Sequence, residues 1–262
     1  MDIIVCAKQV IDPEAPSADL KVDPATNKIV PSLGVACVIN PYDEQALEAA
    51  LRLKDAHGGT ITVLSLGDNL LGDVMKKALA MGADELVFIE DEALAEGDSW
   101  STASTLAAAI KKIGRYDLVV CGRQSSDTDA GQVGSGIAEL LGLPSVTVAR
   151  KIDIAGGTAT VARVLDDGFE VVEVPLPAVI TVSNELGEPR YPTVKGILAA
   201  KKKAPVVWKR ADLPAGDGLV RRTSLVKLFQ PSRQVTCVMV EGETPEEVGA
   251  GLAVKLREAK VI

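Results

Sequence analysis

The residues best suited to chemistry lie in one loop, residues 122–134, with the sequence Gly-Arg-Gln-Ser-Ser-Asp-Thr-Asp-Ala-Gly-Gln-Val-Gly. An apolar run typical of a buried strand, residues 117–121, precedes it, and residues 132–141 carry apolar side chains at helical spacing. Small residues let the backbone approach a ligand, and a helix start offers free N–H groups and a dipole that favours anions. The loop is therefore a candidate phosphate site. A surface turn capped by aspartates is the alternative.

The side chains of this loop divide into donors and acids. Gln124, Ser125 and Ser126 supply neutral donors, and Arg123 supplies a positive charge. Asp127 and Asp129 would repel a phosphate, so we expect them to bind a ribose hydroxyl or backbone N–H groups. The spacing matches neither a Walker A loop nor G-x-G-x-x-G.

Several reaction classes lack the residues they need. The single histidine, His57, precedes two glycines at an expected helix end, and no G-x-S-x-G or H-E-x-x-H is present. No C-x-x-C pair occurs among the four cysteines, so the sequence indicates no zinc site, iron–sulfur site or disulfide framework. We therefore expect neither hydrolase chemistry nor a metal site.

Composition narrows the class further. The chain has 262 residues, of which 47% are hydrophobic and only 3% aromatic, so its core must be aliphatic, as in α/β proteins. A net charge of −8 argues against nucleic acid as a partner. No apolar run reaches 18 residues and the N-terminus lacks a basic start, so we expect a cytoplasmic protein without membrane insertion.

Strands and helices alternate up to Pro144. Expected strands at residues 3–7, 60–66, 85–89 and 117–121 alternate with expected helices that begin at Asn40, Leu71, Asp98 or Ser99, and Gln132. This alternation predicts a parallel sheet covered on both faces, with ligands bound at the carboxyl ends of the strands. If they converge there, the loops at residues 7–10, 37–43, 66–69 and 122–134 form one pocket.

The pattern changes after Pro144. Residues 145–152, 158–165 and 170–174 read as strands, with a turn at 166–168. Residues 184–203 show no clean periodicity, and residues 204–234 are either disordered or extended along a partner subunit; the apolar Trp208, Leu225 and Phe229 favour the partner. A capping box at 244–247 predicts a last helix. We thus expect an α/β domain at 1–183 and a partner-binding segment at 184–262.

Five sequence blocks resemble a known family. They are Cys-Ala-Lys-Gln-Val at 6–10, Asn-Pro-Tyr-Asp at 40–43, Ala-Leu-Ala-Met-Gly-Ala-Asp at 78–84, the loop at 122–134, and Glu-Pro-Arg-Tyr-Pro-Thr-Val at 188–194, with three lysines at 201–203. Over nearly its full length the chain resembles the β (small) subunits of electron transfer flavoproteins. The last block, followed by the lysines, is the most specific.

The resemblance implies an electron carrier rather than a stand-alone catalyst. It implies a Rossmann-like, adenine-nucleotide-binding α/β domain with an added β-hairpin and a C-terminal arm around an alpha subunit. That heterodimer uses FAD held mostly by the alpha subunit to carry electrons between a flavin dehydrogenase of the acyl-CoA type and an acceptor. The β-subunit nucleotide residues would be Cys6, Asn40, Pro41, Tyr42, Asp43, Leu66, Gly122, Arg123, Gln124, Ser125, Ser126, Asp127, Thr128, Asp129, Gly131, Gln132 and Val133. Tyr42 would approach the partner's flavin, and the dehydrogenase-docking residues would be Pro189, Arg190, Tyr191 and Val194.

Two branches of this family differ in the β-subunit nucleotide. One branch holds AMP; the other holds a second FAD, oxidises NADH and splits the electron pair, which is called bifurcation. Gln132-Val133-Gly134, Ala138-Glu139, Gly142 and Pro144 resemble the FAD branch, whereas Ala130 stands where that branch usually has Thr. These residues favour FAD, and AMP stays open. A nucleotide-sensing module on the same fold, without redox function, is the alternative; the long C-terminal segment argues against it.

Overall fold

The computed structural model describes residues 1–94, 97–214, 221–231 and 237–262. The chain forms two compact units, Met1–Lys227 and Leu228–Ile262, which are described separately. None of the described helices has both the length and the hydrophobicity needed to cross a membrane.

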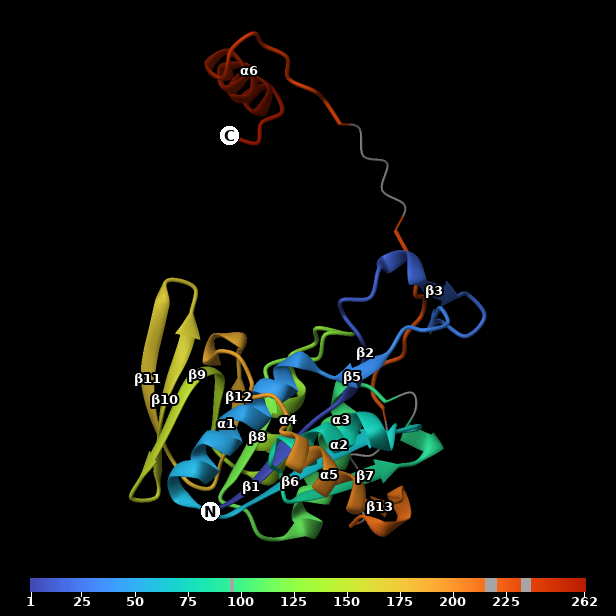
Figure 1. Ribbon diagram of the computed structural model, residues 1–262, viewed down its shortest axis with the longest axis vertical. Coiled ribbons are helices and arrows are strands. Elements are labelled where there is room, and N and C mark those ends of the chain that lie inside the picture. Colours follow the sequence, from blue (N-terminus) through green and yellow to red (C-terminus); the bar gives the residue numbers. More distant parts are fainter. Residues whose placement is uncertain (95–96, 215–220, 232–236) are drawn as a thin grey trace. The chain divides into compact units, whose positions relative to one another are not determined.

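One nine-stranded sheet organises the first unit (Figure 1). Its strands, in chain order, are β1 (Asp2–Cys6), β6 (Thr60–Gly67), β7 (Glu85–Glu90), β8 (Leu118–Gly122), β9 (Ser145–Ala155), β10 (Thr158–Leu165), β11 (Gly168–Pro175), β12 (Ala178–Val182) and β13 (Val206–Trp208). The order across the sheet is β11-β10-β9-β12-β8-β1-β6-β7-β13. Neighbouring strands in the part β9-β12-β8-β1-β6-β7-β13 are parallel, whereas β10 is antiparallel to both β9 and β11. The predicted α/β class with a parallel sheet is confirmed, and the predicted hairpin extends the same sheet.

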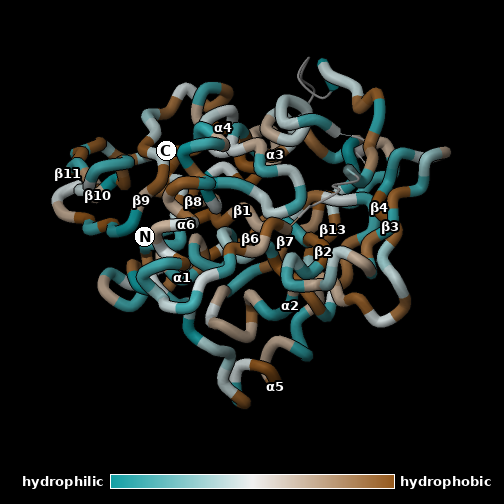
Figure 2. Tube along the Cα trace, turned by 90° about the horizontal axis from the view of Figure 1, so that it is seen from above, coloured by the Kyte–Doolittle hydropathy of each residue, from teal (hydrophilic) through white to brown (hydrophobic). Residues whose placement is uncertain are grey.

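Helices cover both faces of this sheet. They are α1 (Pro41–His57), α2 (Gly72–Met81), α3 (Ser99–Ile113), α4 (Val133–Leu141) and α5 (Val194–Lys202). α1, α2 and α5 share one core cluster with Ile3 and Val5, whereas α3 and α4 share the other with Ile4 and Cys6. The side chains of β1 thus contribute alternately to the two cores, because successive side chains of a strand point to opposite faces of the sheet. Figure 2 shows the hydrophobic residues concentrated along β1, β6, β7 and β8.

Two short pairs complete the N-terminal part. They are β2 (Gln9–Ile11) with β5 (Cys37–Ile39), and β3 (Leu20–Asp23) with β4 (Lys28–Pro31), both antiparallel. The second pair forms a short hairpin. Its turn places residues 26–28 near the cavity described below.

Two elements differ from the expectation for residues 184–234. α5 forms in a stretch where the sequence showed no clean periodicity. The usual apolar pattern is missing because Ala200 is the one buried residue of α5, while Val194 and Leu198 are exposed. Gly196 lets α5 approach α2, since a Cβ there would overlap the carbonyl oxygen of Ala80. β13 then pairs with β7, and Leu213 is buried in the first unit's own core. This part of the segment therefore packs on its own sheet.

The second unit contains one helix, α6 (Pro245–Glu258), among its described residues. The Thr244 side chain accepts the N–H of Glu247, as the capping box predicts. Residues 232–236, part of the predicted partner-binding segment, lie outside the described residues.

Candidate functional site

A cavity of about 800 Å³ lies at the carboxyl ends of β1 and β8. Because the chain runs from β1 to β6 and β7 on one side and places β8 on the other, the strand order reverses between β1 and β8. Ligands of open α/β sheets bind at such a reversal. Cys6 and Cys121, the last register partners of the two strands, both line the cavity. The position is therefore that of a typical ligand site in this fold.

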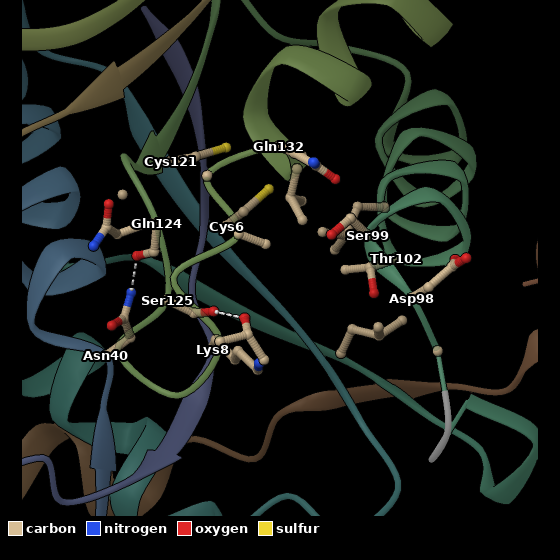
Figure 3. Close-up of a pocket in the computed structure, with 18 of the residues that line it drawn as sticks. Cys6, Lys8, Asn40, Asp98, Ser99, Thr102, Cys121, Gln124, Ser125 and Gln132 are labelled. Carbon is tan, nitrogen blue, oxygen red and sulfur yellow. Dashed lines mark hydrogen bonds between the residues drawn. The ribbon is translucent and has the colours of Figure 1, made fainter. Parts of the chain in front are cut away.

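All four loops predicted from strand ends contribute to the cavity. The expected nucleotide residues that line it are Cys6, Asn40, Asp43, Leu66, Gly122, Arg123, Gln124, Ser125, Thr128, Gly131, Gln132 and Val133. Five others lie nearby without lining it: Pro41, Tyr42, Ser126, Asp127 and Asp129. Figure 3 shows Cys6, Cys121 and Gln124 on one side of the cavity and Ser99 and Thr102 of α3 on the other.

Asp43, near the start of α1, holds the ends of β1 and β8 together. Its carboxylate accepts the backbone N–H of Lys8 at 2.8 Å and that of Gly122 at 3.0 Å. Burial away from water raises the pKa of Asp43 to about 7, against the opposing effect of these hydrogen bonds. Asp43 thus serves as a bridge between two cavity loops, and its two oxygens are already occupied by the protein.

Asn40 positions the loop at residues 122–134. It occupies the N-cap position predicted for α1, but its side chain makes no cap bond. Its amide instead donates to the carbonyl oxygen of Gln124 at 2.8 Å and accepts the N–H of Ser126 at 3.1 Å (Figure 3). The side chain is fully buried, so these bonds satisfy both of its polar ends.

The acids of the loop are paired with other side chains. Asp127 forms an ion pair with the Lys8 ammonium at 2.6 Å, and Asp129 accepts from the Gln124 amide at 2.8 Å. The expectation that these acids bind a ribose hydroxyl or backbone N–H groups stays a prediction. Ser125 and Thr128 share a hydrogen bond at 2.9 Å. The loop is therefore organised by its own contacts, with its acidic charge partly neutralised by Lys8.

The start of α4 offers an anion site that the start of α3 does not. Among the described residues no side chain caps α4, whereas Asp98 caps α3. Val133 and Gly134, in the first turn of α4, line the cavity. Gly134 also brings α4 close to the sheet, since a Cβ there would overlap the methyl group of Thr181. Uncapped N–H groups and the helix dipole suit a phosphate, so this donor set fits a nucleotide.

One wall of the cavity was not expected from the sequence. This wall consists of the cap residue Asp98, of Ser99, Thr102 and Leu106 of α3, and of residues 26–28, Arg221, Thr223, Ser224 and Leu225. The cap at Asp98 was visible as a helix start. The contact of Asp98 with Arg222 and Thr223, more than 120 positions away, could not be predicted, because no local spacing encodes it.

The expected docking residues lie on the opposite face from α3 and α4, at the start of α5. Arg190 is anchored to α1: its Nε lies 2.8 Å from Glu48 and its Nη2 lies 2.9 Å from Asp55. Tyr191 and Val194 are 89% and 76% exposed, and Pro189 is half-buried. The segment is thus held at Arg190 while apolar side chains face solvent.

The comparisons with known proteins agree with this geometry. The family model "Electron transfer flavoprotein domain" matches residues 32–213. The chain is 40% identical to "Caffeyl-CoA reductase-Etf complex subunit CarD" of Acetobacterium woodii over the full length of both. It is 43% identical to "Electron transfer flavoprotein subunit beta" of Thermoanaerobacterium thermosaccharolyticum, covering 81% of this chain and 79% of that one.

A third relative is "Protein FixA" of Azorhizobium caulinodans, 41% identical over 88% of this chain and 85% of that protein. The family match spans most of the chain and includes every element from α1 to β13 and the loop at residues 122–134. The chain therefore belongs to the electron transfer flavoprotein family, among its beta subunits.

Proposed function

We propose that this chain pairs with an electron transfer flavoprotein alpha subunit and holds a nucleotide of its own in the cavity between β1 and β8. The heterodimer carries electrons between a flavin dehydrogenase and an acceptor. Similarity to a subunit named as part of a caffeyl-CoA reductase complex supports a dehydrogenase of the acyl-CoA type as partner. The exposed apolar residues at the start of α5 support docking of that dehydrogenase there.

FAD is the nucleotide we propose for the cavity, with AMP as the alternative. The observation that carries this choice is the cavity's extent: it runs from the start of α4 to the start of α3 and residues 221–225. Its volume of about 800 Å³ lies in the upper part of the range for small-molecule sites, roughly 300–1,000 Å³. The end at α4 suits a phosphate-bearing AMP half, and the remaining space suits the rest of a dinucleotide.

The chain's own residues would bind, orient and shield this ligand. N–H groups of the first turn of α4 would hold phosphate oxygens. Leu64, Leu66 and Leu106 supply an apolar surface that excludes water. FAD supplies one- and two-electron chemistry when bound. With FAD in this cavity, we further propose NADH-dependent electron bifurcation for the heterodimer.

A nucleotide count tests the proposal. The chain is co-expressed with its alpha subunit, the heterodimer is denatured, and the released nucleotides are separated and quantified. Two FAD per heterodimer would support the FAD assignment and make reduction by NADH the next measurement. One FAD and one AMP would support a simple electron shuttle and contradict bifurcation. Release of only the alpha-subunit FAD would contradict a nucleotide in this cavity.

A matched pair of variants tests the proposed phosphate site at the start of α4. Gln132→Asp places a negative charge at the start of α4, where we propose the phosphate, whereas Gln132→Asn is similar in size and neutral. We expect Gln132→Asp to lose the β-subunit nucleotide and keep the alpha-subunit FAD, and Gln132→Asn to keep both. Equal retention by the two variants would exclude the start of α4 as the phosphate site.

A further inference from the structure

A segment distant in sequence closes the α3 end of the cavity. Residues 221–225, which we call the strap, contribute Arg221, Thr223, Ser224 and Leu225 to the lining. The strap has no helix or strand, and its residues are exposed. Its position therefore depends on a few specific contacts with α3.

Asp98 makes most of these contacts. Its Oδ2 accepts the backbone N–H of Arg222 at 2.7 Å, the N–H of Thr223 at 2.8 Å and the Thr223 hydroxyl at 3.1 Å. The Arg222 guanidinium lies over the ring of Trp100, 3.7 Å from its centre. One carboxylate oxygen and one indole ring thus hold two successive strap residues.

The two oxygens of Asp98 have separate tasks. Oδ1 accepts the N–H of Ser101 at 2.8 Å and so caps α3, while Oδ2 accepts the backbone N–H groups of Arg222 and Thr223 in the strap. Although partial burial acts to raise it, these N–H donors hold the pKa of Asp98 well below its usual range. The carboxylate therefore stays ionised and keeps both tasks at neutral pH.

The lining at this end suits a flat ring with polar edges. Leu106 and Leu225 provide apolar surface, while Ser99, Thr102, Thr223 and Ser224 provide hydroxyl groups. In Figure 3 Gln132, at the start of α4, lies between Cys121 and Ser99, whereas Asp98, which holds the strap, lies beyond Ser99 and Thr102. Since the strap is held at Asp98, away from the proposed phosphate site, it is placed to contact the portion of a dinucleotide that extends beyond its AMP half.

We propose that Asp98 is a positioning residue that holds the strap as the wall of the α3 end, and that this wall retains the flavin-bearing half of FAD. The inference rests on the proposed function, because it assumes that the cavity binds an adenine nucleotide. AMP, bound at the α4 end, does not require the strap.

Asp98→Asn separates the two tasks of this residue. Asn caps helices as well as Asp does, so its oxygen can still accept the N–H of Ser101. Its NH₂ group then faces the N–H groups of Arg222 and Thr223, donor against donor, and the strap loses its anchor. Ser101→Ala is the matched control, because it removes the capping-box hydroxyl and leaves every strap contact in place.

The measurement is equilibrium binding of FAD and, separately, of AMP to the heterodimer after its β-subunit nucleotide is removed and with the alpha-subunit FAD in place. For Asp98→Asn we expect FAD affinity to fall about tenfold or more and AMP affinity to stay within about twofold. For Ser101→Ala we expect a lower unfolding temperature and unchanged FAD affinity. Arg222→Ala, which keeps the backbone donors, should fall between wild type and Asp98→Asn.

The possible failures are distinguishable. If the wild-type heterodimer binds neither FAD nor AMP in this subunit, the proposed function fails. If it binds AMP but not FAD, or if Asp98→Asn binds FAD as tightly as wild type, the strap proposal is overturned while nucleotide binding stands. Equal losses of FAD and AMP affinity would also overturn it, because the wall would then not be specific to the flavin-bearing half.

Discussion

The backbone N–H of Gly122 donates to the carboxylate of Asp43 across 79 residues of chain, at 3.0 Å. The same carboxylate accepts the N–H of Lys8, so one buried side chain joins the first residues after β1, the end of β8 and the start of α1. These are the elements that meet at the cavity. The geometry of the candidate site therefore depends on a hydrogen-bonded contact within the protein itself.

Gly122→Ala should disrupt this junction. An added Cβ would overlap Asp43 Oδ1 and lie 2.7 Å from the backbone carbon of Tyr42, so α1 would have to shift. We expect a loss of about 1–3 kcal/mol in unfolding free energy, typical of overpacking. Gly72→Ala at the start of α2 is the control, because a Cβ there meets nothing within 4 Å. Comparable unfolding temperatures for the two variants would show that the approach at Gly122 is not critical.

Stability should depend on pH through Asp43. Burial raises the pKa of Asp43 to about 7 from an ordinary value of 3.8, so the folded chain binds this proton more tightly than the unfolded chain. The Asp43 contribution to the unfolding free energy therefore falls as pH rises from about 4 to 7, by up to about 1.4 kcal/mol per pH unit, and is level above pH 7.

The measurement is thermal unfolding of wild type and Asp43→Asn between pH 5 and 7. Glu48 and Asp98 do not titrate in this pH range, because their pKa values are lowered. Their contributions to the unfolding free energy are lost only in more acidic solution. We expect the stability of wild type relative to the variant to decrease across the window. A constant difference would show that Asp43 titrates elsewhere.

Arg190→Ala should destabilise the chain more than Arg52→Ala. Both arginines pair with Glu48, whose side chain is only 6% exposed. Arg190 reaches it from 142 residues away and also pairs with Asp55, whereas Arg52 is a more exposed i,i+4 partner on α1. We expect losses of about 1–3 kcal/mol for Arg190→Ala and about 0.3–0.5 kcal/mol for Arg52→Ala, measured by unfolding. The reverse order would contradict an anchoring role for Arg190.

Val194→Ala should weaken dehydrogenase docking without affecting folding. Val194 is 76% exposed at the first position of α5, so its truncation leaves no internal cavity. A contact at the centre of an interface typically contributes more than about 1 kcal/mol, so the concentration of heterodimer needed for half-maximal electron transfer should rise several-fold. Val171→Ala, at a 62% exposed position of β11, is the control. Equal kinetics for both variants would remove Val194 from the proposed docking site.

Much of the first unit could be predicted from local pattern alone. β10 has the predicted bounds, and the starts of α1 and α3 follow from the Asn-Pro pair at 40–41 and the cap at Asp98. These predictions succeed because apolar alternation and capping residues act within a few positions of each other. The convergence of four loops on one cavity follows from the same information, since parallel strands end at one edge of their sheet.

The tertiary structure decided what depends on distant residues. α5 was missed because its apolar residues Val194 and Leu198 are exposed, which hides the usual periodicity, and β13 is too short at three residues to show one. The raised pKa of Asp43 and the contact of Asp98 with Thr223 likewise arise only when remote segments meet. By itself the sequence determined the sheet and the position of the loop at residues 122–134, because these follow from local spacing, and its motif blocks identified the family by resemblance. Burial, charge pairing and the second wall of the cavity required the fold, because free energies of desolvation and long-range hydrogen bonds depend on neighbours that lie far along the chain.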